Sequence, residues 1–255
     1  MRIPEDWDKP SPGNHKLCEK FEYGSFEYQG NLPYRLFKPE GGEKVPLVVY
    51  LHGADAFGND NEAQLEMHDI GTVFARDTWQ ERHPAYILAP QVKASGHWAG
   101  PRGGKVCALI SELVRDHSDI DTDRIYIYGY SAGGIGALKL IKDHPGLFAA
   151  AIPICAATDD EDLECLKSIP VWLIHAADDE IVKVSYRNVR FPGSTLGSRD
   201  IYEVLKDSAP KLRYTEYPEG YMKSHYGINP HCTWVPAAEN EEAGEWMFSK
   251  KKGES

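Results

Sequence analysis

Short runs of consecutive apolar residues, separated by amphipathic stretches, restrict the fold of this chain more than any other feature. The runs are apolar at nearly every position, which is typical of strands buried on both faces. They are Leu47–Leu51, Ala85–Ala89, Ile125–Tyr128, Ala149–Ile154 and Val171–His175, with a weaker sixth run at Leu212–Tyr217. Strands of this kind form parallel sheets whose two faces are both covered by helices.

Helical patterns lie between these runs. The segment Lys105–Asp116 carries apolar residues at the spacing of one helix face. Further helices are predicted at Gly134–Lys142, Asp200–Lys206 and Glu239–Phe248. Alternation of strands and helices predicts βαβ units, and therefore an α/β protein with a mostly parallel, doubly wound sheet. Ligands of such sheets bind beyond the carboxyl ends of the strands, so we look for functional residues there.

The first part of the chain has a different pattern. Phe21–Tyr28 and Leu32–Phe37 alternate polar and apolar residues around Gln29-Gly30-Asn31, which predicts an antiparallel hairpin at one end of the sheet. No internal repeat or low-complexity linker divides the 255 residues. We therefore expect residues 1–255 to form a single domain, with its core at about 32–248.

Charge and composition exclude several functional classes. The net charge of −11 disfavours nucleic-acid binding, and the one tight basic run is Lys250-Lys251-Lys252. No stretch is long and apolar enough for a membrane helix, so we expect no membrane partner. The first residues, MRIPEDWDKPSPGNHK, lack the apolar core of a signal peptide. A cytoplasmic protein is expected, with a form whose leader has been removed as the alternative.

The five cysteines agree with a reducing compartment. Cys18, Cys107, Cys155, Cys165 and Cys232 are scattered, odd in number and form no C-x-x-C pair. Thiols rather than disulfides are expected, and neither a zinc knuckle nor a redox dithiol is indicated.

The segment Gly129-Tyr130-Ser131-Ala132-Gly133-Gly134 is the strongest functional signal. Its G-x-S-x-G pattern directly follows a buried strand and directly precedes a helical pattern, which is the context of a nucleophile elbow. The glycines two residues on either side of Ser131 allow strand and helix to approach. The turn also places Ser131 at a helix N-terminus, where unpaired backbone N–H groups favour negative charge.

With this motif, the chain resembles the α/β-hydrolase superfamily. Within the superfamily it resembles serine esterases similar to prolyl-oligopeptidase-like and polyhydroxybutyrate-depolymerase-like enzymes. The resemblance spans about residues 32–248. Its motifs occur in family order at predicted strand ends: Leu51-His52-Gly53-Ala54 with Gly58-Asn59-Asp60-Asn61, Leu88-Ala89-Pro90-Gln91, the elbow, His175–Val182 and His231-Cys232-Thr233-Trp234. It implies the α/β-hydrolase fold, with helices on both faces of the sheet, and no cofactor.

The resemblance also implies a catalytic triad. A serine needs a histidine to accept its proton and a carboxylate to hold that histidine. The family order Ser…Asp…His selects Ser131, Asp179 and His231. Asp178 stays open as the acid, and His225 stays open as the base. The resemblance further implies an oxyanion hole formed by the backbone N–H groups of Ala54 and Ala132, with Asp55 as the alternative to Ala54.

Other residues near the predicted strand ends receive secondary roles. His52 and His175 are expected to brace loops, and Trp98 and Trp234 to wall a substrate pocket, with packing at the rim of the core as the alternative. Val184–Ser198 is expected either to overhang that pocket or to form a surface loop. His225, His231, Asp178 and Asp179 have the chemistry of metal ligands but not the spacing, so no metal site is predicted.

These features predict a carboxylesterase-type serine hydrolase that works through an acyl-enzyme. We expect a small-molecule ester as its partner, either a short-chain ester or an acetyl or feruloyl ester of a carbohydrate or phenolic compound. A small peptidase or amidase of the same fold, and a non-catalytic relative that binds a small molecule, are the alternatives. The oligomeric state and the natural ester do not follow from the sequence.

Overall fold

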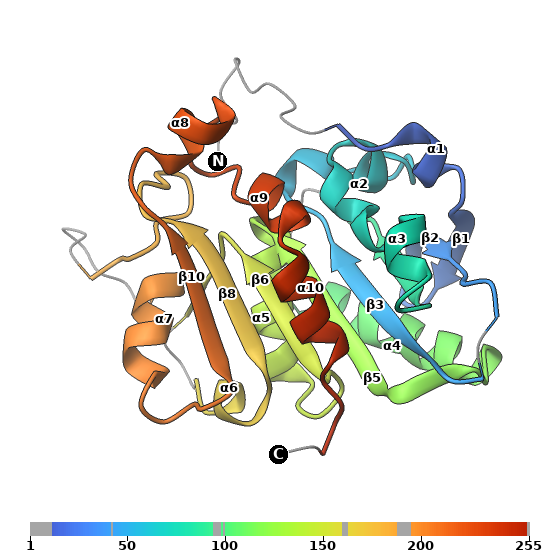
Figure 1. Ribbon diagram of the computed structural model, residues 1–255. Coiled ribbons are helices and arrows are strands. Elements are labelled where there is room, and N and C mark those ends of the chain that lie inside the picture. The colour runs from blue at the N-terminus through green and yellow to red at the C-terminus, as the bar shows by residue number, and fades with distance from the viewer. Residues whose placement is uncertain are drawn as a thin grey trace.

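A computed structural model describes residues 12–41, 43–93, 98, 100–159, 163–187 and 195–253. Its main feature is a sheet of eight strands in the order β1-β2-β4-β3-β5-β6-β8-β10 (Figure 1). These strands are β1 (Glu22–Glu27), β2 (Asn31–Phe37), β3 (Val45–Leu51), β4 (Tyr86–Pro90), β5 (Ile120–Tyr130), β6 (Ala150–Ile154), β8 (Val171–Ala176) and β10 (Leu212–Tyr217). A separate two-stranded sheet pairs β7 (Ala157–Asp159) with β9 (Thr195–Gly197).

The strand directions confirm the predicted sheet. The six strands from β4 to β10 run parallel to their neighbours, whereas β1 and β2 form an antiparallel hairpin that joins the sheet at β4. Gln29 and Gly30 both have positive φ, 52° and 94°, as the tight turn of this hairpin requires. The arrangement is that of an α/β-hydrolase sheet, whose carboxyl-end edge is available for a site.

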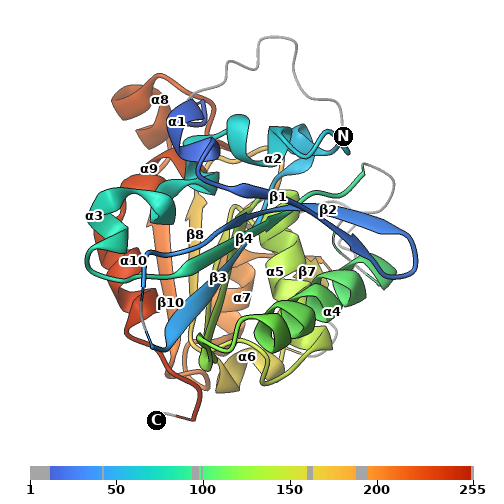
Figure 2. The same cartoon turned by 90° about the vertical axis from the view of Figure 1, so that its right-hand side faces the viewer.

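Helices cover both faces of the sheet (Figure 2). The α-helices are α1 (His15–Cys18), α2 (Ala63–Glu66), α3 (Asp77–Gln80), α4 (Pro101–Asp116), α5 (Ala132–Asp143), α6 (Cys165–Ser168), α7 (Ser198–Leu205), α8 (Tyr221–Tyr226), α9 (Trp234–Glu239) and α10 (Glu241–Phe248). The described residues also form 3-10 turns at η1 (Ala54–Ala56), η2 (Asp69–Gly71) and η3 (Val73–Ala75).

The predicted boundaries differ at several helices. The helix expected at Lys105–Asp116 begins four residues earlier at Pro101, because proline is favoured in the first turn of a helix. The helix expected from Glu239 begins at Glu241, since the Asn240 side chain accepts a hydrogen bond from the Ala243 N–H and caps α10. The short helices α1, α2, α3, α6, α8 and α9 are additional to the prediction, because a four- to six-residue helix has too little periodicity to detect.

Each face of the sheet has its own hydrophobic core. Along β3 the side chains alternate: Leu47, Val49 and Leu51 pack with α4 and α5, while Val48 and Tyr50 pack with α3 and α10. Every residue of β3 is buried, which explains the uninterrupted apolar run. No helix within the described ranges has the length and apolar character needed to cross a membrane.

Candidate active site

Ser131 lies in a strained turn between β5 and α5. Its φ of 52° and ψ of −120° are unfavourable for a residue with a side chain. The two flanking glycines explain how the turn fits. A Cβ on Gly133 would lie 1.9 Å from the Leu51 carbonyl oxygen, and one on Gly129 would lie 2.5 Å from the same atom. The G-x-S-x-G pattern is therefore required because the elbow packs against the backbone at the end of β3.

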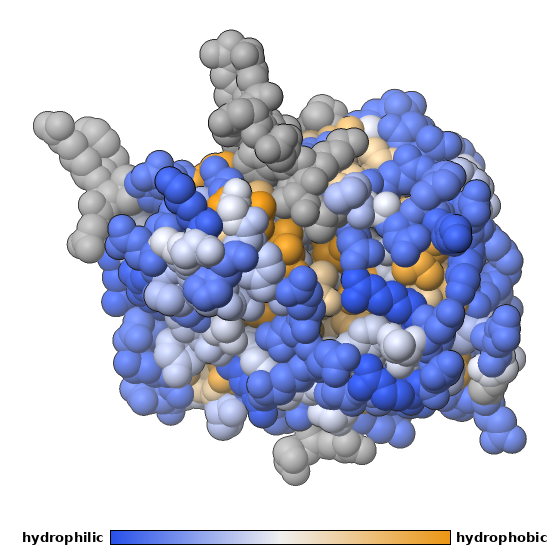
Figure 3. Space-filling model, turned by 45° about the horizontal axis from the view of Figure 1, so that its top comes forward, coloured by the Kyte–Doolittle hydropathy of each residue, from blue (hydrophilic) through white to orange (hydrophobic). Residues whose placement is uncertain are grey.

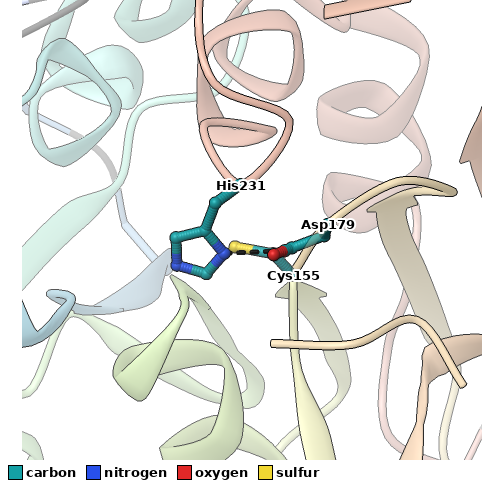
Figure 4. Close-up of side chains that lie close together, drawn as sticks. All are labelled: Cys155, Asp179 and His231. Atoms are coloured by element: carbon teal, nitrogen blue, oxygen red, sulfur yellow. Dashed lines mark hydrogen bonds and ion pairs between the residues drawn. The ribbon is translucent and has the colours of Figure 1, made fainter. Parts of the chain in front are cut away.

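Three side chains from separate parts of the chain form a hydrogen-bonded row above this turn. The Ser131 hydroxyl lies 2.9 Å from His231 Nε2. On the other side of the ring, His231 Nδ1 donates to Asp179 Oδ2 at 2.6 Å, as Figure 4 shows. All three are nearly buried, with 4%, 2% and 4% of their surface exposed respectively. The structure thus brings together the serine, base and acid selected from the sequence.

Asp179 is held as an acceptor on both of its oxygens. Oδ1 accepts the backbone N–H groups of Ile181 and Val182, while Oδ2 accepts His231 and also His175 Nε2–H at 3.1 Å. Burial by itself raises the pKa of this carboxyl, but the hydrogen bonds and charges of the two histidines outweigh it and hold the pKa well below its usual range. Asp179 is therefore a carboxylate at neutral pH.

The two alternative residues lie outside this row. Asp178 turns away, and its Oδ2 accepts the Gly220 N–H at 2.9 Å. His225 is exposed on α8, where its Nδ1 contacts the Tyr221 carbonyl and the Ser224 hydroxyl. Successive residues after a strand end point in different directions, which is why only one of the two aspartates reaches His231.

Cys155 adds a thiol next to the row (Figure 4). Possible ligand atoms of Cys155, Asp179 and His231 all lie within 4.8 Å of one another, so distance alone permits a metal. However, His231 Nδ1 and Asp179 Oδ2 are already bonded to each other, and Cys155 Sγ accepts the Ser131 N–H at 3.2 Å. Burial also raises the pKa of the Cys155 thiol well above its usual value, which disfavours the thiolate that metals bind. The donor set therefore does not fit a resident metal.

The two residues predicted to supply the oxyanion hole, Ala54 and Ala132, each begin a helical turn. Ala132 is the first residue of α5, and Ala54 is the first residue of η1, so neither N–H has an acceptor within its own turn. The close packing of Gly133 on Leu51 and His52 brings the two turns together. The N–H of Asp55 lies in the same first turn as that of Ala54, so the alternative remains.

Trp98 and Trp234 do not line an open pocket, which corrects the role predicted for them. Their exposed fractions are 0% and 1%. Trp98 Nε1 donates to the His52 carbonyl at 3.1 Å, and Trp234 packs against the rings of His68 and Tyr130. Both indoles support the loops around the site from within, because their large apolar area is better satisfied in the core than in water.

The loop Val184–Ser198 falls partly outside the described residues, which omit 188–194. At its end, Thr195–Gly197 forms β9 and pairs with β7. A Cβ on Gly197 would lie 2.3 Å from the Lys183 and Val184 carbonyl oxygens, so this end of the loop packs closely on its beginning.

His52 and His175 brace the neighbouring loops. His52 Nδ1–H donates to the Gly53 carbonyl at 2.7 Å, and its Nε2 accepts the Val92 N–H at 3.2 Å. His175 connects Asp179 and the Val182 carbonyl to the Ser198 hydroxyl, which lies 2.8 Å from Nδ1. Burial lowers the pKa of His52 to about 4, although its hydrogen bond to Gly53 and the charges of Asp55 and Asp60 oppose this.

This buried histidine makes stability depend on pH in a defined window. In the unfolded chain an imidazole titrates near pH 6.5, so between about pH 6.5 and 4 the unfolded state binds a proton that folded His52 excludes. The free energy of unfolding should therefore be highest above pH 6.5 and fall by up to about 3 kcal/mol as the pH decreases to 4. Urea unfolding at several pH values measures this dependence. Between pH 6.5 and 4, the free energy of unfolding should fall less steeply for His52→Gln than for the wild type. Equal slopes for the two proteins would contradict this role of His52.

A buried cluster beside the serine was not found from the sequence. Asp55 accepts hydrogen bonds from His68 Nε2 and from the Tyr130 hydroxyl, each at 2.6 Å. The sequence indicates Asp55 only as a backbone donor, and no motif marks the side chains of His68 and Tyr130. Their positions along the chain carry no spacing signal, because three distant segments meet only in the folded protein.

Comparisons with known proteins agree with this site. A family model described as "Prolyl oligopeptidase family" matches residues 104–185, a range that contains both Ser131 and Asp179. A poly(3-hydroxyalkanoate) depolymerase C from Paucimonas lemoignei is 27% identical over 157 residues, which cover 54% of this chain and 36% of the depolymerase.

Solved structures extend the likeness to nearly the whole chain. A thermostable esterase is 37% identical with a TM-score of 0.81, and the match covers 94% of this chain and 65% of the esterase chain. An acylaminoacyl peptidase from Pyrococcus horikoshii shares the fold at 18% identity and a TM-score of 0.63, over 94% of this chain and 44% of the peptidase.

This chain thus spans about two thirds of the esterase chain and about one third of the depolymerase. The doubly wound sheet, the strained serine elbow and the similarity to an esterase along most of the sequence agree with one another. The chain has the α/β-hydrolase fold and is similar to the serine esterases of that fold.

Proposed function

We propose that this protein is a carboxylic-ester hydrolase that works through an acyl-serine intermediate. The observation that carries the proposal is the hydrogen-bonded row Ser131–His231–Asp179 at a strained strand–helix turn. One relative is named an esterase and another a depolymerase of poly(3-hydroxyalkanoate), a polyester, which supports the same reaction class.

The chemistry follows from the positions of the three side chains. His231 Nε2 takes the Ser131 proton as Oγ attacks the ester carbonyl, and the backbone N–H groups of Ala54 and Ala132 stabilise the tetrahedral oxyanion. The imidazolium then returns its proton to the departing alcohol, which leaves an acyl-serine. Water repeats the sequence and releases the acid. Asp179 keeps the proton on His231 Nδ1 throughout and stabilises the imidazolium.

We further propose a short acyl group joined to a polar alcohol, such as an acetylated carbohydrate, with feruloyl esters in the same class. Ser131 exposes only 4% of its surface, which suits a small acyl group. Figure 3, which brings the carboxyl ends of the strands forward, shows apolar residues recessed among hydrophilic ones on this face.

A cavity with several polar side chains in its lining supports the alcohol part of this proposal. Its volume is about 450 Å³, and its lining includes Asn31, Asn59, Gln91, Lys93 and Lys105. Val92, also in the lining, donates its N–H to His52, so the cavity adjoins the loop that begins after β3. Amide and ammonium groups can hydrogen-bond to several sugar hydroxyls at once.

A panel of esters tests this substrate class. We expect kcat/KM for p-nitrophenyl acetate and butyrate to exceed that for the palmitate ester by at least about tenfold, because a long chain does not fit around a nearly buried serine. Asn59→Ala should raise KM for acetylated xylo-oligosaccharides several-fold and leave p-nitrophenyl acetate unaffected. The highest activity on long-chain emulsions would contradict the proposal.

A peptidase remains the second candidate. The match of residues 104–185 to the prolyl oligopeptidase family favours it, because the same acyl-enzyme chemistry cleaves amides. Including peptide p-nitroanilides in the panel decides between the two: amide turnover equal to or above ester turnover would support the peptidase.

A further inference from the structure

The Asp55 carboxylate is fixed from two sides in the interior of the protein. His68 donates to Oδ2 from the loop after α2, and Tyr130 donates to Oδ1 from the end of β5. The His68 side chain is fully buried, and only 10% of the Asp55 side chain is exposed. A carboxylate removed from water in this way is stable only when its two oxygens accept hydrogen bonds from the protein.

These contacts connect the two parts of the expected oxyanion hole. Asp55 directly follows Ala54 in η1, and Tyr130 directly precedes Ser131 and Ala132. The loop also lies directly on the tyrosine ring, because a Cβ on Gly53 would be 2.3 Å from Tyr130 Cε2. One hydrogen bond, from the Tyr130 hydroxyl to Asp55, therefore spans from one amide-bearing turn to the other.

The rings around this bond allow little movement. Tyr130 packs against Trp234 with ring centroids 4.5 Å apart, and the His68 ring contacts both of them, with centroid distances of 5.4 and 4.8 Å. Trp234 in turn contacts the His231 ring edge to face. Displacing Asp55 would thus disturb the supports of the base as well as those of the loop.

The negative charge of Asp55 lies close to the expected oxyanion hole, so its position matters for catalysis. Negative charge develops on the substrate near this loop, and a free carboxylate would oppose it. Burial raises the pKa of Asp55, but hydrogen bonds from His68 and Tyr130 and the charge of His68 outweigh burial and lower the pKa overall. The hydrogen bonds from His68 and Tyr130 therefore fix the distance between the Asp55 carboxylate and the place where the oxyanion forms.

We propose that Asp55, clamped by His68 and Tyr130, is a positioning residue that aligns the Ala54 amide with the Ala132 amide for oxyanion binding. This inference rests on the proposed esterase function. It predicts a loss in the chemical step rather than in substrate binding, because the oxyanion exists only after attack on the carbonyl.

Tyr130→Phe is the sharpest test, since it removes one hydroxyl and keeps the ring. Tyr128→Phe is its matched control: Tyr128 lies two residues earlier on β5, is equally buried, and donates to the Ile70 carbonyl at 3.0 Å. Asp55→Ala removes the clamp entirely, and Asp55→Asn keeps an acceptor for Tyr130. Each variant is assayed with p-nitrophenyl acetate and with its thiono analogue, whose carbonyl sulfur accepts hydrogen bonds poorly.

We expect Tyr130→Phe to lower kcat for the oxygen ester about 10- to 100-fold with little change in KM. The preference for the oxygen ester over the thiono ester should shrink by a similar factor. Asp55→Ala should lose at least as much, Asp55→Asn should recover part of it, and Tyr128→Phe should match the wild type in both respects. If Asp55→Ala does not fold, the result for Tyr130→Phe alone tests the positioning role of Asp55.

The outcomes separate two failures. A wild-type protein that neither hydrolyses esters nor reacts with a fluorophosphonate disproves the esterase function itself. An active wild type whose oxygen-to-thiono preference is unchanged in Tyr130→Phe and Asp55→Ala disproves the clamp alone, as does an equal loss in Tyr128→Phe.

Discussion

Replacing Ser131 by alanine is expected to reduce ester hydrolysis by about 10³-fold or more and to abolish labelling by a fluorophosphonate probe. The reason is geometric: the Ser131 hydroxyl is the group that lies 2.9 Å from His231 Nε2. Members of such a row act as a unit, so loss of the nucleophile removes most of the catalysis that all three provide. Steady-state hydrolysis of p-nitrophenyl acetate and gel fluorescence of the labelled protein measure the two effects.

The fold should survive this change. The substitution removes one hydroxyl, and alanine meets the same backbone strain at φ of 52° as serine does. Ser111→Ala is a matched control, because the Ser111 hydroxyl donates to the Cys107 carbonyl within α4, away from the site. It should retain full activity and labelling. Near-wild-type turnover by Ser131→Ala, with its thermal unfolding unchanged, would end the serine-hydrolase proposal.

Asp179→Asn is expected to lower kcat by about 10³- to 10⁴-fold with only a small change in fold. Oδ1 accepts two backbone N–H groups, so the amide oxygen of asparagine should stay there and place its NH₂ group toward His231. An NH₂ group at that point favours an unprotonated Nδ1, which moves the imidazole proton to Nε2. Nε2 then faces Ser131 as a donor and cannot accept the serine proton.

Asp178→Asn provides the comparison at the neighbouring position. Asp178 Oδ2 accepts the Gly220 N–H, and an amide oxygen can accept the same hydrogen bond. We expect it to retain more than about a tenth of wild-type kcat. The reverse ranking of these two variants would show that Asp178, not Asp179, orients the base.

Much of the fold could be read from the chain because buried parallel strands have an unusual composition. Each strand of the parallel part lies between two layers of helices, so nearly every residue must be apolar, as in β3. The observed helix boundaries differ from the predicted ones by a few residues where a capping residue or a proline sets the end of the helix. Asn240, which caps α10, is an example. Short helices such as α2 were not predicted, because they are too short to show a helical period in the sequence and are stabilised by tertiary contacts.

Patterns within short segments of the chain identify the residues that local chemistry requires. Gly129, Ser131 and Gly133 belong to one turn, and their spacing is a property of that turn alone. The order of strands along the chain likewise places Asp179 and His231 after strand ends on the same edge of the sheet. Such features depend on neighbours in the sequence and on one rule of sheet topology, so they are visible before folding.

Which side chains face one another across that edge depends on the packing of the folded protein. It turned Asp179 rather than Asp178 toward His231, buried Trp98 and Trp234 beneath the site, and joined Asp55 to His68 and Tyr130. Each of these outcomes depends on side-chain directions and distances between segments far apart in the chain. Packing sets such distances to a fraction of an ångström, and no pattern within a single segment of sequence encodes them.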